Sequence, residues 1–410
     1  MNFLSLTPQL PYPPRQGAAI RNWGILRELA KQHDVHLLSF AEQDATDLPH
    51  LASLTTVAPP VRHLTERLRD LIRTTEPDMA RRLWSHEFAN ALEQLLSRHS
   101  FDVVQVEGIE MVPYALPYLG HQTGPIWVYD AHNAETDLQR SAMLADWRKP
   151  TRWHAAAYSA IQVWKLKRYE SQHLPKFDQV VAVSELDAQH LKQLSGATPL
   201  VIPNGIDSKQ FAPNRYPPAP AMQKQTAPAL VFTGKMDFRP NVDALLWFVD
   251  HILPHIESDG LRPILWAVGQ KPHPALARLQ SHPQVIITGW VDAIEPYLAG
   301  ADVVVVPLRM GSGTRLKVLQ ALSMARPVVG TTLGCAGLSL RHGEHLCLAD
   351  DPLPFANAIS QMLRQPNQAA KMGQQGRKHI QQHFDWRVLV PKLEQALTAI
   401  SPTRPTLASS

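Results

Sequence analysis

Short apolar segments alternate with longer amphipathic segments along nearly the whole chain. The first apolar segment, Asn2–Leu6, is followed by a loop and then by a segment whose apolar residues recur at helical spacing. The segment 303–306 consists of four valines, so it is apolar on both faces, as a strand covered by helices on both sides must be. Repeated strand–helix units of this kind predict the α/β fold class, with doubly wound parallel sheets.

The predicted strands fall into two series. Strands of the first series are expected at 2–6, 35–40, 103–107, 126–129 and 180–184. Strands of the second series are expected at 229–233, 264–268, 285–288, 302–307 and 327–331. Each series is long enough to form a domain with its own core.

A break in composition separates the two series. Asn204-Gly205 is a turn signal, and the residues from there to Pro228 are rich in Pro, Ala and Gln, which does not fit a sheet interior. We therefore predict two Rossmann-like domains, over residues 1–203 and 204–384, that face each other across a cleft. A helix over 385–400 is expected to return to the first domain, and 401–410 to form a frayed tail.

Composition and charge narrow the choice of function. The 410 residues carry 40 Lys and Arg against 36 Asp and Glu, and this net charge of +4 gives no grounds for a nucleic-acid partner. Cys335 and Cys347 are the only cysteines, so no disulfide framework is expected. The N-terminus lacks the pattern of a signal peptide, and no run of ~18 apolar residues occurs, so we expect a cytoplasmic protein.

The most informative stretch follows the four-valine strand directly and opens a helix. It contains Gly311, Ser312, Gly313, Thr314, Arg315 and Lys317. Glycines let a ligand approach the backbone, a helix start presents free N–H groups, and two cations suit a diphosphate. The stretch therefore predicts phosphate binding, although a turn followed by a solvated basic helix would have the same sequence. No Gly-Lys-Ser/Thr follows the glycines, so the stretch is not a P-loop.

A second candidate loop follows the first strand of the second domain. Gly234, Lys235 and Arg239 lie where a strand-end loop would face a ligand. The alternative is a surface loop in which Pro240 starts the next helix.

Candidate residues of the first domain are fewer. His132 ends a strand, where it could hydrogen-bond a substrate hydroxyl or a reacting oxygen, or be a satisfied structural histidine. Gly17, in the loop after the first strand, either lets the backbone approach a ligand or serves an ordinary turn, and no Gly-x-Gly-x-x-Gly fingerprint occurs there.

In the second domain, His251 and His255 have zinc-ligand spacing on a predicted helix, but no third ligand accompanies them, so we predict no metal.

Tryptophans and basic residues are mixed in two nearby segments, Trp147–Trp153 and Trp164–Arg168. This composition suits the interface of an anionic membrane. It suits equally well tryptophans that pack on the core beneath a solvated basic face.

Several motifs occur in one order along nearly the whole chain. They are Pro11–Gly17 with Arg21, Asp130–Glu135, Val183–Glu185, Ile202–Asp207, Phe232–Asp237 with Arg239–Asn241, Gly289–Asp292, Val306–Leu308, Gly313–Leu319 and Arg326–Val329. In this order they resemble the family 4 glycosyltransferases, and most of all the bacterial branch of sugar transferases associated with exopolysaccharide and exosortase systems. The resemblance implies the GT-B fold of two facing Rossmann-like domains.

The resemblance also implies an activity, namely transfer of a sugar from a nucleotide-sugar donor to a polysaccharide or lipid-linked acceptor with retention of anomeric configuration. The second domain would hold the nucleotide and the first the acceptor, with no metal and no cofactor besides the nucleotide-diphosphate sugar as co-substrate. His132 would lie beside the donor sugar and the loop of Gly17 near the diphosphate. His132, Lys235 and Arg315 are the expected catalytic residues, because negative charge must be stabilised on the leaving diphosphate. In the front-face route of this family the departing phosphate takes the acceptor's proton, so no enzyme nucleophile is needed.

The chain departs from the family pattern at three informative positions. A pair of glutamates spaced eight apart, the second of which contacts the ribose hydroxyls, is replaced by Ser312 and Gln320. A basic residue about six positions after Lys235 is replaced by Asn241, and the cations of the glycine-containing stretch are candidates to supply its charge. We still expect Gln320 to contact the ribose.

Two other functions stay open. The first is a catalytically lapsed protein of the same fold that binds a nucleotide sugar or a partner enzyme without turnover. The second is a sugar-nucleotide epimerase, which needs carboxylates as acid and base, for which Glu107 and Glu135 are the first-domain candidates.

Overall fold

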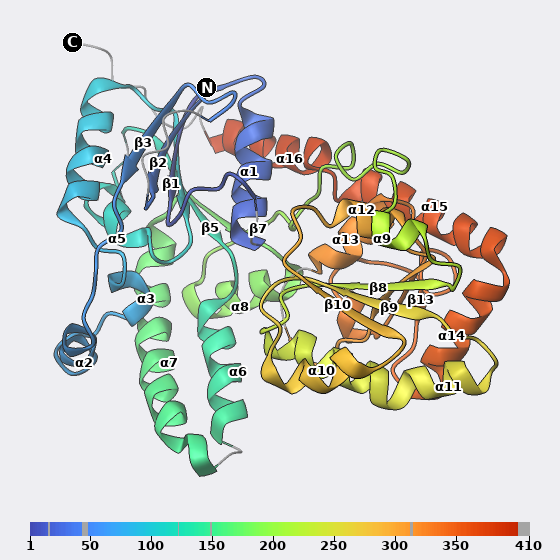
Figure 1. Ribbon diagram of the computed structural model, residues 1–410. Coiled ribbons are helices and arrows are strands. Elements are labelled where there is room, and N and C mark those ends of the chain that lie inside the picture. Colours follow the sequence, from blue (N-terminus) through green and yellow to red (C-terminus); the bar gives the residue numbers. More distant parts are fainter. Residues whose placement is uncertain (15–16, 43–47, 122, 148–149, 312–314, 401–410) are drawn as a thin grey trace. The chain divides into compact units, whose positions relative to one another are not determined.

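The computed structural model describes residues 1–14, 17–42, 48–121, 123–147, 150–311 and 315–400. The chain forms two compact units, one of Met1–Pro203 with the segment from Leu389 onward and the other of Asn204–Val388 (Figure 1). Each unit contains one parallel sheet. The predicted frayed tail, 401–410, lies outside the described residues.

The first unit has a seven-stranded sheet in the order β3-β2-β1-β4-β5-β6-β7. Its strands are β1 (Asn2–Thr7), β2 (Asp34–Phe40), β3 (Ser53–Val57), β4 (Val103–Glu107), β5 (Ile126–Ala131), β6 (Gln179–Ala182) and β7 (Leu200–Val201). Its helices are α1 (Gly17–Leu29), α2 (Leu64–Arg73), α3 (Asp78–Arg81), α4 (His86–Arg98), α5 (Val112–Ala115), α6 (Glu135–Trp147), α7 (Trp153–His173) and α8 (Glu185–Ser195). The strand order reverses between β1 and β4, so the carboxyl ends of these two strands form the switch point where ligands bind in such sheets.

The second unit has a six-stranded sheet in the order β10-β9-β8-β11-β12-β13. Its strands are β8 (Ala229–Thr233), β9 (Ile264–Val268), β10 (Val285–Gly289), β11 (Val303–Val306), β12 (Val328–Gly330) and β13 (Cys347–Leu348). Its helices are α9 (Pro220–Gln223), α10 (Arg239–Trp247), α11 (Leu253–Ser258), α12 (Glu295–Ala299), α13 (Leu316–Ser323), α14 (Pro352–Arg364) and α15 (Pro366–His383). Here the order reverses between β8 and β11.

Shorter helical turns connect these elements, and one last helix links the two units. The turns are Leu116–Tyr118, Pro150–Arg152, Leu174–Lys176, Phe248–Ile252, Pro274–Ser281 and Leu333–Cys335. Helix α16 (Trp386–Ile400) begins in the second unit and belongs to the first from Leu389 onward, where Glu394 pairs with His33 Nε2 at 2.8 Å. No helix among the described residues is long and apolar enough to cross a membrane.

The prediction of two doubly wound parallel sheets is confirmed. The four valines of β11 are at most 1% exposed, because neighbouring strands and helices cover both of their faces. The strand predicted to end at Ser184 is shorter, since Ser184 caps α8 by accepting a hydrogen bond from Asp187 N at 3.1 Å. Three edge or near-edge strands were not predicted; β7 and β13 have two residues each, and β3 is only half-buried along its length.

Candidate functional site

Both predicted phosphate loops of the second unit lie at the switch point of its sheet. Strand β8 leads into the loop with Gly234, and the neighbouring strand β11 leads into the loop with Gly311. Because the carboxyl ends of parallel strands meet at one edge of the sheet, the two loops lie together there. Ser312, Gly313 and Thr314, which the sequence predicts to bind phosphate, lie outside the described residues.

Contacts between Gly234, Asn241 and Lys317 join the two loops. Lys317 Nζ donates to Asn241 Oδ1 at 2.9 Å and lies 4.0 Å from the centre of the Phe232 ring. Asn241 Nδ2 in turn donates to Lys235 O at 2.9 Å. Gly234 has a φ of +153°, and a Cβ there would approach Asn241 Nδ2 to 2.7 Å and Lys317 Nζ to 3.2 Å. Only glycine therefore lets the backbone lie against this ammonium group.

The ammonium group of Lys317 is held in a site that disfavours its charge. Burial, together with the positive charge of Arg315, lowers the pKa of Lys317 to about 7. Among the described residues no carboxylate pairs with Lys317. An anion that entered between the two loops would supply the missing partner, so the site is suited to a phosphate group.

Arg315, predicted to be a phosphate ligand, also makes hydrogen bonds to the protein backbone. It is 8% exposed, and its guanidinium donates to Gly311 O at 2.8 Å and to Leu333 O at 3.2 Å. These bonds tie the two sides of the glycine-containing loop to the turn after β12, so Arg315 supports the loop in addition to lying beside it. Its binding to a diphosphate stays a prediction.

The other predicted donor residues of the second unit lie around this cluster. The side chain of Lys235 is 54% exposed and lies 3.7 Å from Asp237, and Arg239 is the exposed first residue of α10. Pro240 follows at the second position of α10, where its missing N–H costs no hydrogen bond. Gln320 lies on α13, one turn after Lys317, and is partly exposed.

In the first unit, a buried ion pair lies beneath the carboxyl ends of the strands. Arg21, on α1, forms a two-pronged pair with Asp130 of β5, with distances of 2.8 to 3.1 Å. Both side chains are at most 1% exposed, and Arg21 Nη1 also donates to Ile202 O at 2.9 Å. The pair therefore joins α1 to β5, and Arg21 also holds the residue that follows β7. Its role is structural.

His132, one residue after β5, forms a hydrogen-bonded pair with Glu107, the last residue of β4. The distance between His132 Nε2 and Glu107 Oε2 is 3.0 Å, and Gln105 Nε2 donates to the other oxygen of Glu107 at 2.6 Å. Burial by itself lowers the pKa of His132, but the hydrogen bond and charge of Glu107 outweigh it, so the pKa is raised. Burial and the charge of Asp130 raise the pKa of Glu107 in turn. Each group of the pair therefore keeps its proton to a higher pH than it would in water.

Two more carboxyl groups of the first unit have altered acidity. Burial raises the pKa of Glu135 to about 7, against a hydrogen bond from Asn133. Burial also raises the pKa of Glu170 to about 7, against a hydrogen bond from the Thr136 hydroxyl. The first unit therefore contains several groups that can hold or release a proton near neutral pH.

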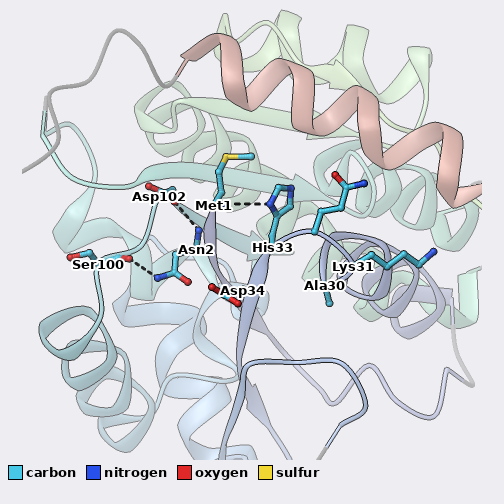
Figure 2. Close-up of a pocket in the computed structure, with 9 residues that line it drawn as sticks. Met1, Asn2, Ala30, Lys31, His33, Asp34, Ser100 and Asp102 are labelled. Carbon is cyan, nitrogen blue, oxygen red and sulfur yellow. Dashed lines mark hydrogen bonds between the residues drawn. The ribbon is translucent and has the colours of Figure 1, made fainter.

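Gly17, the remaining predicted residue, is the exposed first residue of α1, and the two residues before it lie outside the described residues. A depression of about 510 Å³ in the described part of the chain lies elsewhere. It is at the amino end of β1, lined among others by Asn2, His33 and Asp102, and Asn2 N donates to Asp102 there at 2.7 Å (Figure 2). None of the predicted site residues lines it, and ligands of such sheets bind at the opposite edge.

No three His, Cys, Asp or Glu side chains of the described residues come together in a way that could hold a metal ion. His251 and His255 lie on the helical segment that joins α10 to α11 and on α11 itself, without a third ligand of this kind.

Sequence reasoning missed two residues of these sites. Asn241 was noted only as a departure from a family pattern, although it is the direct partner of Lys317. Glu107 was named only as a candidate acid or base, although the strand register places it opposite Asp130, two residues before His132. The position of each residue in the chain could have identified both. Glu107 ends β4 and Asn241 follows β8, and each of these strands borders the switch point of its sheet.

Comparisons with known proteins agree with this organisation. Residues 15–210 match the model of the family described as Glycosyltransferase Family 4, and residues 227–365 match that described as Glycosyl transferases group 1. An uncharacterized 44.6 kDa protein in the cps region of Klebsiella pneumoniae is 23% identical over 164 residues, which are 38% of this chain and 42% of that protein. The chain thus matches less than half the length of this relative.

Two solved structures illustrate the similarity of fold. Sucrose-phosphate synthase from Thermosynechococcus elongatus has a TM-score of 0.67 at 17% identity, covering 98% of this chain and 99% of that one. HepE from Anabaena, in complex with UDP and glucose, has a TM-score of 0.63 at 16% identity, covering 97% of this chain and all of that one.

Proposed function

Since the chain belongs to the family 4 glycosyltransferases and has their two-domain GT-B fold, we propose that it transfers a sugar from a nucleotide-diphosphate donor to a glycan or lipid-linked acceptor, with retention of configuration. The family was expected from the motifs, and it is confirmed by the two model matches. The HepE structure contains UDP and glucose, which supports a donor of the same kind for this chain.

The observation that carries the proposal is the Lys317 cluster at the β8/β11 switch point. A partly buried ammonium group without a carboxylate partner among the described residues lies against a backbone that only glycine allows. We propose that the donor's diphosphate lies here, on Lys317 and the backbone of Gly234 and Gly311. Arg315, Lys235 and Arg239 would add positive charge, and Gln320 would meet the ribose.

In this proposal the cations of the second unit stabilise the charge that grows on the diphosphate as the glycosidic bond lengthens, without a metal ion. The departing phosphate oxygen takes the proton of the acceptor hydroxyl, which attacks from the same face of the sugar. His132 binds the donor sugar through Nδ1, and the loop of Gly17 approaches the diphosphate. Glu107 keeps the ring of His132 oriented.

The acceptor is proposed from the genomic region of a relative. The Klebsiella relative is from a cps region, and this supports an acceptor in the synthesis of a surface polysaccharide. The exopolysaccharide and exosortase branch suggested by the motifs remains a prediction. We propose action at the cytoplasmic side, where nucleotide sugars are made.

The test is incubation of the purified protein with a panel of nucleotide sugars and lipid-linked or oligosaccharide acceptors. Release of free nucleotide and the shift of melting temperature by each donor are both recorded. Acceptor-dependent release supports the proposal, whereas binding without release identifies a lapsed enzyme, and conversion of the donor sugar into its epimer identifies an epimerase. Lys317→Met is the matched variant, in which both the shift and the release should be lost.

A further inference from the structure

Helices α6 and α7 form an antiparallel hairpin that extends from the sheet of the first unit (Figure 1). The hairpin exposes large apolar side chains. The set that we call the tryptophan face consists of Leu144, Trp147, Trp153, Ile161 and Trp164, which are 41–63% exposed. Trp147 and Trp153 stack on each other with ring centres 6.4 Å apart. The alternative that these tryptophans pack on the core is wrong.

The large apolar residues of α7 are exposed, whereas polar side chains on its inner side make hydrogen bonds to the rest of the first unit. Trp153, Ile161 and Trp164 are spaced by eight and three residues and therefore share one side of the helix. On the inner side, Gln162 accepts from Asp78 N at 2.9 Å, and Lys165 Nζ donates to Leu71 O at 2.9 Å. The middle of α7 thus has the reverse of the usual arrangement, with polar side chains buried and large apolar ones in solvent.

An exposed apolar face of this kind is characteristic of an interaction surface. Its composition identifies the partner. Between Trp147 and Arg168 the sequence has six Lys and Arg and no Asp or Glu, and one of the six, Lys165, is buried on the inner side of α7. Lys167 and Arg168 are exposed where the tryptophan face ends, whereas Arg152 pairs with Asp146 at 3.1 Å. Tryptophan is the apolar residue that favours the interface between lipid and water, and exposed cations favour anionic headgroups.

We propose that the tryptophan face binds the surface of an anionic phospholipid bilayer, with its tryptophans at the interface and Lys167 and Arg168 against the headgroups. A second copy of the chain fits less well, since pairing two such faces would bring like charges together. The inference rests on the proposed function, because a lipid-linked acceptor requires the enzyme to reach a bilayer. It adds which surface does so.

The experiment is flotation of the full chain with vesicles, either phosphatidylglycerol mixed with phosphatidylcholine or phosphatidylcholine alone. Binding is expected to the anionic vesicles at low salt and to be lost at high salt, because exposed charges are screened. Trp153→Ser/Trp164→Ser should weaken this binding at least tenfold. Lys167→Ala/Arg168→Ala should weaken it by about thirtyfold, since each cation near an anionic surface contributes about fivefold.

Matched controls come from the second unit. Lys371→Ala/Lys378→Ala removes two exposed cations of α15, and Leu353→Ser removes an exposed apolar residue of α14; both should bind vesicles as the unchanged protein does. Nucleoside-diphosphate affinity is measured for every variant and should not change.

Three results would overturn the inference. The first is that the unchanged protein does not float with anionic vesicles, and the second is that the control variants lose binding as much as the tryptophan and cation variants. The third is that the unchanged protein does not bind vesicles but forms a dimer, which Trp153→Ser/Trp164→Ser abolishes. Nucleotide binding without vesicle binding would reject this inference alone. Vesicle binding without nucleotide binding would instead reject the donor site.

Discussion

Replacing Lys317 with methionine should weaken binding of a nucleoside diphosphate and at the same time remove an unfavourable buried charge from the ligand-free protein. Methionine keeps the length of the side chain and its packing near Phe232, but it offers no donor to a phosphate oxygen. The substitution should thus lower the affinity for the nucleoside diphosphate and raise the unfolding free energy of the ligand-free protein. A merely structural lysine would not give this combination.

The size of the binding effect follows from the contact. A hydrogen bond to a charged group contributes about 1.5–3 kcal/mol, which corresponds to a loss of affinity of roughly tenfold to a hundredfold. The pH dependence follows from the pKa of about 7. Since a phosphate stabilises the charged lysine, binding takes up a proton, and the fraction of Lys317 already charged falls from about one half at pH 7 to about one in a hundred at pH 9. Affinity should therefore fall over that interval, by up to roughly fiftyfold when the bound phosphate keeps the lysine charged at pH 9, and by less than tenfold when the contact contributes only about 1.5 kcal/mol.

The effect on stability has a defined sign as well. In the unfolded chain the pKa of this lysine has its ordinary value of 10.5, whereas in the folded protein it is about 7. The cost of charging it in the fold is therefore fully present below pH 7 and fades as the pH rises towards 10.5. The gain in unfolding free energy of Lys317→Met over the unchanged protein should shrink over the same range.

Isothermal titration calorimetry at pH 7 and pH 9, in buffers of different ionisation enthalpy, measures both the affinity and the proton uptake. Urea denaturation at the same pH values measures the stability difference. Lys371→Met, an exposed lysine of α15, is the control. Unchanged affinity in Lys317→Met, or a pH dependence that survives the substitution, would refute the assignment of Lys317 to the diphosphate.

Three further predictions follow from the two units. Gln320→Glu should tighten nucleotide binding by up to about tenfold, because a charged acceptor strengthens hydrogen bonds to the ribose, and Gln320→Leu should weaken it; equal affinities in calorimetry would remove Gln320 from the ribose site. Glu107→Gln should lower the pKa of His132, so that the inflection of the pH–rate profile and the histidine's NMR titration both move to lower pH, whereas a structural role alone would leave them in place. Arg21→Ala should cost about 3–5 kcal/mol of unfolding free energy in urea, because Asp130 would stay buried without its partner, and a loss below 1 kcal/mol would contradict that account.

Much of the fold could be predicted because apolar strands buried on both faces leave a strong local signal. The bounds of β4, β8 and β9 agree with the prediction to the residue. The strands β7 and β13 could not be predicted, since two residues at or near a sheet edge carry no periodicity. Their pairing depends on the rest of the sheet being in place.

The candidate site could be predicted only as two separate loops. Strand-end position and glycines pointed to Gly234 and Gly311, and the sheet order shows why these loops meet. The contact between Asn241 and Lys317 joins residues 76 positions apart, and that between His132 and Glu107 joins residues 25 apart. No local pattern encodes such pairs, because they depend on which strands become neighbours.

The role of Arg315 could also be predicted only in part from the sequence. Its sequence position beside the glycines suggested a free cation, and its bonds to Gly311 O and Leu333 O show that it also supports the loop. Removing it should therefore lower stability as well as affinity, which makes Lys317 the better probe of the diphosphate.

The most direct test of the central claim is NMR spectroscopy of the anomeric proton during turnover, with the best donor and acceptor from the panel and with EDTA present. The account predicts a new glycosidic bond of the same anomeric configuration as the donor, formed at an unchanged rate when metal ions are chelated. An inverted linkage, a reaction abolished by EDTA, or a donor that is bound but never transferred would contradict it.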